Sequence, residues 1–292
     1  MRTRSSAMSD LVNVTRAELA KLVRRPAAWV LLAAAITLDQ VFGFVIPYLS
    51  YKNGSGGAMT DGESPAQLLA GTLPAQVITN TTAAFPVFAG ALALVLGALV
   101  AGNEFTGGTL KTLLTQGPRR ASVFGGQLLA LVTAVGVGVL ALFLTCAASA
   151  LGIALVEDQA VGWPSIGDLA AGLGSGWLVM AMWASLGAVF GVVLRSVALP
   201  IGLGVVWILG IENLISAVAR TSLTALQPLR DLLPGVSSGS LISSVLPVQI
   251  GPLPPGVQST VSGERGLATV AAYAVVAALT VVVVGRRRDV SA

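Results

Sequence analysis

The sequence has no histidine, one cysteine and few charged residues, and each of these shortages excludes a class of protein. Without histidine, the chain cannot form a Ser-His or Cys-His nucleophile pair, an HExxH zinc site or a histidine proton relay. Cys146 alone can form neither an internal disulfide nor a thiolate metal cluster. We therefore expect a non-catalytic chain with no metal and no cofactor of its own.

The scarcity of charge points to a membrane protein. Only 10% of the 292 residues are charged, against about 25% in a typical soluble domain. Hydrophobic residues make up 54%, they are grouped in long blocks, and 34 glycines accompany them, a frequency typical of membrane helices. The fold class that we expect is all-α, a polytopic membrane protein with no face suited to nucleic acid.

Six apolar spans are expected within a single transmembrane domain that covers residues 1–292. They are residues 27–49, 79–101, 122–156, 169–194, 197–219 and 267–285. The first block competes with a cleaved signal peptide, but it is longer than the usual apolar core of about 7–15 residues. Span three would measure ~52 Å as one helix against a hydrocarbon core of ~30 Å. It therefore either projects from the membrane or breaks at one of its glycines.

Three further segments flank or connect these spans. Residues 9–25 have an apolar stripe at helical spacing and predict an amphipathic helix that lies in the headgroup plane; a simple basic flank is the alternative. Residues 50–78 are rich in Gly, Ser and Pro and are expected to form a loop. Residues 220–266 combine many prolines with leucines, which predicts short re-entrant helices that dip into the outer leaflet.

The distribution of Lys and Arg sets the orientation. With both termini in the cytosol, every basic residue falls inside except Lys52, Arg220, Arg230 and Arg265. Cytosolic segments carry such an excess of positive charge. We expect a multi-pass protein of the cell (plasma) membrane with cytosolic N- and C-termini.

The segment 102–121, between spans two and three, is the most informative stretch. Leu110, Leu113 and Leu114 have helical spacing and would form a small apolar surface for a cytosolic partner. The alternative is a surface loop that lies on lipid headgroups.

This segment also resembles a known family. Glu104, the pair Gly108-Thr109, Leu113-Leu114, Pro118 and Arg120 resemble the E…GT…LL…P…R signature of ABC type-two permeases, the membrane subunits of type V ATP-binding-cassette exporters. The layout of helix, spans and loops is similar over nearly the whole chain. Gln127 departs from the pattern, because many members carry Lys at the head of span three.

The resemblance implies a permease subunit that works with a separate ATPase. The residues that would couple to it are Glu104, Gly108, Thr109, Leu110, Leu113, Leu114, Pro118 and Arg120, in a cytosolic coupling helix. The chain has no GxxxxGK[ST] loop, so ATP and Mg would be bound by the partner. Two ATPase copies and a second permease, identical or homologous, would complete the exporter in the lipid bilayer.

Asp39 in span one and Glu212 in span five are the acids inside spans, and Asn213 follows the second. An ionised carboxylate in lipid is costly, so such residues face a cavity or a partner, or are protonated. They are candidates for the translocation path, and a neutral acid bonded to a neighbouring helix is the equal alternative. Gly187 and Gly191 form a GxxxG pattern in span four, a possible close-packing face.

Two rival functions remain at the level of sequence. A stand-alone proton- or ion-coupled transporter or channel would use Asp39 and Glu212 as its sites, and a membrane enzyme is disfavoured by the lack of histidine. The uniformly aliphatic spans do not name a substrate, and multidrug, lipid or peptide export all fit. The composition, with little Lys beside much Ala, Gly and Val, suggests a bacterial source.

Overall fold

The computed structural model describes residues 7–54, 62–106, 120–221, 223–247 and 254–287, and these residues form helices joined by turns and irregular connections, with no strand among them. Five helices are long and apolar enough to cross a membrane, at Pro26–Asn53, Ala121–Val156, Ile166–Leu194, Ala198–Ala219 and Gly263–Arg286. A sixth apolar helix, Phe88–Asn103, is shorter. The all-helical membrane class is confirmed, whereas a count of six spans stays a prediction.

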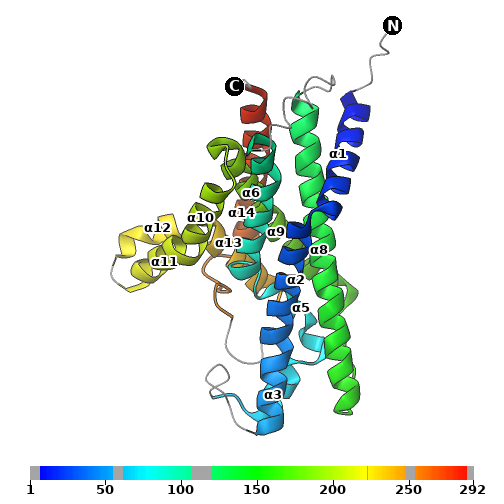
Figure 1. Cartoon of the computed structure of the whole chain (residues 1–292). Helices are drawn as coiled ribbons and strands as arrows, with labels where there is room; N and C mark the ends of the chain where they lie inside the picture. Colours follow the sequence, from blue (N-terminus) through cyan, green and yellow to red (C-terminus); the bar gives the residue numbers. More distant parts are fainter. Residues whose placement is uncertain (1–6, 55–61, 107–119, 222, 248–253, 288–292) are drawn as a thin grey trace.

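Helices α1, α2 and α3 follow one another in one direction, whereas α6, α8 and α9 run alternately up and down the bundle (Figure 1). Their bounds are α1 Ala7–Arg24, α2 Pro26–Gln40, α3 Ile46–Asn53, α4 Pro65–Gly71, α5 Val77–Thr82, α6 Phe88–Thr106, α8 Arg120–Val156, α9 Ile166–Leu194, α10 Ala198–Val206, α11 Glu212–Thr221, α12 Gln227–Arg230, α13 Pro234–Val245 and α14 Gly263–Arg287. Short 3-10 turns lie at Pro74–Gln76 and Thr224–Leu226.

Spans one and five each contain a π-helical turn. It lies at Val41–Val45 between α2 and α3, and at Trp207–Ile211 between α10 and α11. In each turn a backbone N–H bonds to the carbonyl five residues earlier, Ile46 to Val41 and Glu212 to Trp207. Such turns are rare and occur often at functional sites.

The expected loop at 50–78 and the expected start of span two at 79 are both wrong. Helix α4 begins at a capping box, in which Ser64 and Gln67 bond each other's backbone N–H, and α5 follows it. Both short helices bury apolar side chains, such as Leu68 and Ile78. Residues 83–87 then form a turn around Pro86, which cannot continue a helical hydrogen-bond ladder. The apolar helix expected as span two therefore begins at Phe88.

Span three is one continuous helix rather than a broken one. Helix α8 has 37 residues, about 55 Å at 1.5 Å per residue, so it is longer than a bilayer core. Helix α1 lies lengthwise beside the first half of α8 (Figure 1), and Gly125 and Gly126 leave room for Leu11 and Val14. This lengthwise contact gives no support to an in-plane orientation of α1, which stays a prediction.

The centre of the bundle is the contact between α6 and α9. A Cβ on Gly97 would clash with the backbone of Ala184, and one on Gly187 would clash with the backbone of Leu94. Gly191 likewise faces Ala98 and Gly102. The GxxxG pair thus does form a close-packing face, on which two helix backbones approach each other as in other membrane bundles.

The ends of the helices separate into two sets. The start of α1, the end of α6, the start of α8 and the end of α14 all lie at the upper end of Figure 1, together with the junction of α9 and α10. The ends of α3 and α8 lie at the lower end, beside α4. The start of α1, the end of α14 and the two helix ends that flank the expected coupling segment thus share one end of the bundle.

Candidate functional site

The π-helical turn of span five orients the side chains that follow it. Residues five apart are brought onto one side of the helix, and Trp207 Nε1 therefore donates to Glu212 Oε1 at 2.7 Å. Asn213 Nδ2 donates to the carbonyls of Ile208 and Leu209, both at 3.1 Å. The side-chain amide thus bonds to carbonyls of the π-helical turn, and these bonds hold its nitrogen against the helix.

Glu212 is buried, with 5% of its surface exposed. Its second oxygen, Oε2, accepts a hydrogen bond of 2.8 Å from the backbone N–H of Gly235, at the start of α13. A Cβ on Gly235 would clash with that same oxygen. This bond joins span five to the segment between spans five and six, and only a glycine leaves space for it.

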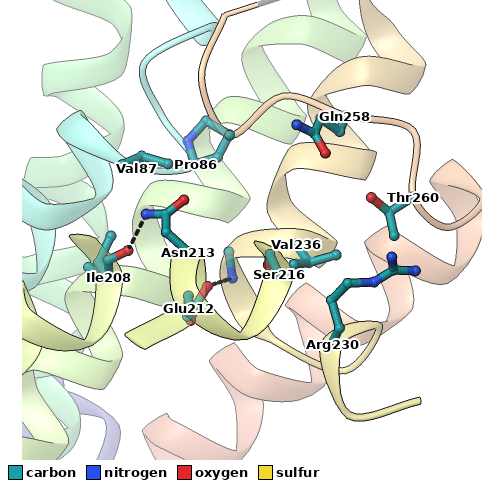
Figure 2. Close-up of a pocket in the computed structure, with 12 residues that line it drawn as sticks. Pro86, Val87, Ile208, Glu212, Asn213, Ser216, Arg230, Val236, Gln258 and Thr260 are labelled. Carbon is teal, nitrogen blue, oxygen red and sulfur yellow. Dashed lines mark hydrogen bonds between the residues drawn. The ribbon is translucent and has the colours of Figure 1, made fainter. Parts of the chain in front are cut away.

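Glu212 and Asn213 line a cavity of about 60 Å³ (Figure 2). The remaining polar wall consists of Ser216, Arg230, Gln258 and Thr260. Pro86 and Val87, from the turn before α6, form part of the apolar wall. The cavity therefore lies between span five, the beginning of span two and the segment that precedes span six.

Residues 258–261, beside the cavity, are bonded to a serine of α13. Ser240 Oγ, on α13, donates to the Gln258 carbonyl at 3.0 Å and accepts from the backbone N–H of Val261 at 3.2 Å. Gly256 has a positive φ of 90°, which side-chain-bearing residues rarely adopt. The stretch around Gln258 and Thr260 is thus a fixed cover and not merely a connection.

Arg230 is paired within its own segment. Its Nε and Nη2 both donate to Asp231 Oδ1, at 2.9 and 2.7 Å. The charge of this guanidinium is therefore already neutralised by a neighbouring carboxylate where it meets the cavity.

Asp39, the other acid within a span, is surrounded differently. It is buried, and Cys146 Sγ of α8 donates to its Oδ2 at 2.5 Å. The next residue, Gln40, accepts a bond of 2.5 Å from Ser149 Oγ, also on α8. Asp39 and Gln40 thus tie span one to span three, and Asp39 does not line the cavity around Glu212.

A third acid fastens the ends of the same two spans that lie at the lower end of Figure 1. Glu157, directly after α8, accepts from Tyr48 Oη at 2.5 Å, from Tyr51 Oη at 3.0 Å and from Lys52 Nζ at 2.6 Å. Lys52 also lies 5.6 and 5.5 Å from the two ring centroids. The bonds from Lys52 and then Tyr48 lower the pKa of Glu157 to about 2. We call Tyr48, Tyr51, Lys52 and Glu157 the outer clasp.

The expected coupling residues fall mostly outside the described residues. Gly108, Thr109, Leu110, Leu113, Leu114 and Pro118 all belong to that undescribed part. Glu104 lies in the last turn of α6, and Arg120 is the first residue of α8. Gln127, which departs from the signature, is buried and donates to the Val100 carbonyl of α6 at 3.1 Å. It therefore fastens span three to span two without a charge.

A family model places the chain among known proteins. The model described as "ABC-2 family transporter protein" matches residues 12–289, which is almost the whole bundle from α1 to α14. The chain belongs to the ABC-2 transporter family. The resemblance of the chain to ABC type-two permeases is thereby confirmed, and this ABC-2 protein is a multi-pass membrane protein. No curated protein matches its sequence.

The sequence pointed to Glu212 and Asn213 of this ABC-2 protein but not to their partners. Trp207, which bonds Glu212, lies five residues before it, and Gly235, the second partner, lies in a different helix, α13. A Trp five residues before an acid could have been noticed as a signal, but only if the π-helical turn were known. Gly235, Gln258 and Thr260 carried no signal, since tertiary folding alone brings them to the cavity.

Proposed function

We propose that this chain is the permease subunit of an ATP-driven exporter. It would form the translocation path, pair with a second permease copy or a homologous permease, and bind two copies of a separate ATPase subunit. ATP and Mg would act in the partner. Closure of the ATPase pair would move the coupling segment 102–121, and that motion would pass into spans two and three.

The observation that carries the proposal is the family match over residues 12–289. Two features of the chain support it. The ends of α6 and α8 lie beside the start of α1 at one end of the bundle (Figure 1), where an ATPase could reach all three. Helix α8 is longer than a bilayer core, so its first half would stand in the cytosol and present the coupling segment to a partner.

Two matched variants in the coupling segment test the proposal. Leu113→Asp puts a charge on the apolar face that would dock in the ATPase, whereas Thr112→Asp puts the same charge on the opposite side of the expected helix. The permease and its ATPase are co-expressed, and co-purification and stimulated ATP hydrolysis are measured. Leu113→Asp should abolish both while the protein still inserts, and Thr112→Asp should retain them.

The rival is a stand-alone transporter that uses Asp39 and Glu212 as ion sites. The enclosure of Asp39 by Cys146 favours a structural role for that acid and weakens the rival. Full export by the Leu113→Asp protein, or export without any ATPase, would contradict the exporter proposal and support the rival.

A further inference from the structure

The cavity beside span five has an unbalanced charge. Glu212 brings a carboxylate, and the bonds to its two oxygens come from neutral N–H groups, those of Trp207 and Gly235. Among the residues that the structure describes, no ion pair involves Glu212, whereas Arg230 is already paired with Asp231. The sum over these three charged groups is one negative charge.

The hydrogen bonds of Glu212 suit the ionised form. An ionised carboxyl group has acceptors only, whereas a neutral one also carries an O–H donor that needs an acceptor of its own. Both oxygens of Glu212 accept from N–H donors. A buried carboxylate without a counter-charge is costly, and a cation beside it offsets part of that cost.

Other cavity groups also present oxygen atoms. Because Asn213 Nδ2 is bound to two carbonyls of its own helix, its Oδ1 is left to face away from that helix, as Figure 2 shows. The hydroxyl groups of Ser216 and Thr260 line the same space. A primary ammonium group has three donors and no acceptor, and such a wall of acceptors complements it.

The size of the cavity limits what can enter. A volume of about 60 Å³ corresponds to roughly four to six water molecules at 10–15 Å³ each. That is enough for a head group but not for a drug-sized molecule. Pro86, Val87, Ile208 and Val236 give the cavity an apolar side as well, which suits the first carbons of an alkyl chain better than a bare metal ion.

We propose that this cavity binds the ammonium head group of a cationic amphiphile, with Glu212 as its counter-ion and Asn213 Oδ1 as a second acceptor. Such a head group belongs either to an amino-lipid of the membrane or to a soluble amphiphilic amine. The ligand is held where span five meets the segment before span six. That the ligand is then exported rests on the proposed function above, whereas its binding does not.

Binding is tested on the full chain in lipid nanodiscs without the ATPase, with n-octylammonium as the probe. The variants are Glu212→Gln, which removes the charge and keeps the shape, and Glu264→Gln, which makes the same change at an exposed position at the start of α14. Partition into the disc is the same for all three proteins, so differences in affinity report the cavity. Glu212→Gln should weaken binding at least tenfold, and Glu264→Gln should leave it unchanged.

A ligand series on the unmodified protein needs no variant and therefore does not depend on folding. Octanol and octyl sulfate should not displace octylammonium. Displacement by phosphatidylethanolamine identifies a lipid source, and its failure to displace identifies soluble amines; either result supports the cavity. Equal affinity for octanol, or undiminished binding by well-folded Glu212→Gln protein, would overturn the proposal. Octylammonium binding without ATPase co-purification would contradict only the exporter function.

Discussion

Two regions of the bundle are held together in opposite ways. Helices α6 and α9 meet through glycines, so that Gly97 and Gly187 bring backbone against backbone. Span five instead meets its neighbours around a cavity, through hydrogen bonds to Glu212 and the short helices that follow. The first contact leaves no room for a ligand or for adjustment. The second contains polar groups and space, which is what a binding site in a membrane protein requires.

The difference is tested most directly by adding one methyl group to a glycine of α9. Gly187→Ala would push a Cβ into the Leu94 carbonyl, whereas Gly174→Ala, on the same helix, meets no atom within 4 Å. Overpacking of this kind costs about 1–3 kcal/mol, and an unhindered Gly→Ala change in a helix can gain up to about 1 kcal/mol. Thermal unfolding in detergent should show a large loss of stability for Gly187→Ala only.

Equal stability of the two alanine variants would mean that α6 and α9 can separate at little cost. The α6–α9 contact would then be no more rigid than the surroundings of span five, and the contrast between the two regions would fail.

Substitutions around span five should cost less stability than substitutions in the α6–α9 contact. Trp207→Phe removes the hydrogen bond to Glu212 Oε1 and keeps the aromatic ring. Water in the cavity can replace the lost donor, so the free energy of unfolding should fall by about 1 kcal/mol, the usual net value of one hydrogen bond. The same variant should weaken octylammonium binding, because the carboxylate loses a bond that orients it. A loss of stability as large as that of Gly187→Ala would contradict this view of span five.

The sequence predicted these two regions unequally. Apolar blocks, charge bias and the GxxxG pattern were enough for the class of fold and for one face of the α6–α9 contact. The partner glycine, Gly97, could not be predicted, because many glycines occur at helical spacing in this chain and only packing selects among them. The loop expected at 50–78 was wrong, since the Ser64–Gln67 capping box lay within a stretch that composition alone marked as irregular.

The site was predictable only in part. Polar residues within apolar spans stand out, so Asp39 and Glu212 could be named from the sequence. Their roles could not be separated, because the difference lies in partners more than a hundred residues away for Asp39 and in a second segment for Glu212. Neither π-helical turn beside these acids was predicted from the sequence, and the turn that precedes Glu212 brings its side chain beside Trp207.

Removing a contact beside Asp39 should cause a smaller loss of stability. Ser149→Ala removes the hydroxyl that donates to Gln40 of span one, whereas Thr145→Val removes a hydroxyl that bonds only within α8, to the Leu142 carbonyl. Hydrogen bonds between membrane helices contribute about 0.6 kcal/mol on average. Ser149→Ala should therefore lower stability slightly more than Thr145→Val, as measured by unfolding in SDS. Octylammonium binding should be unchanged in both, and weakened binding in Ser149→Ala would connect the two acids after all.

Loss of the outer clasp should have the smallest effect on stability at neutral pH, and it should change how stability depends on pH in acid. The bonds from Lys52, Tyr48 and Tyr51 lower the pKa of Glu157 from 4.5 to about 2. A carboxyl group whose pKa is lower in the folded state stabilises the fold above its unfolded pKa, and this stabilisation is lost as the pH falls toward the folded value. The contribution of Glu157 to stability should therefore be constant from pH 7 to about 5 and should disappear between about pH 4.5 and 2.

The melting temperature is measured as a function of pH. In Glu157→Gln protein the loss of stability that Glu157 causes in acid should be missing, and Glu264→Gln serves as the exposed control. If the two glutamine variants lost stability in parallel over this range, the clasp would not be holding spans one and three together, and the contacts of Asp39 and Gln40 would be the only polar ties described between them.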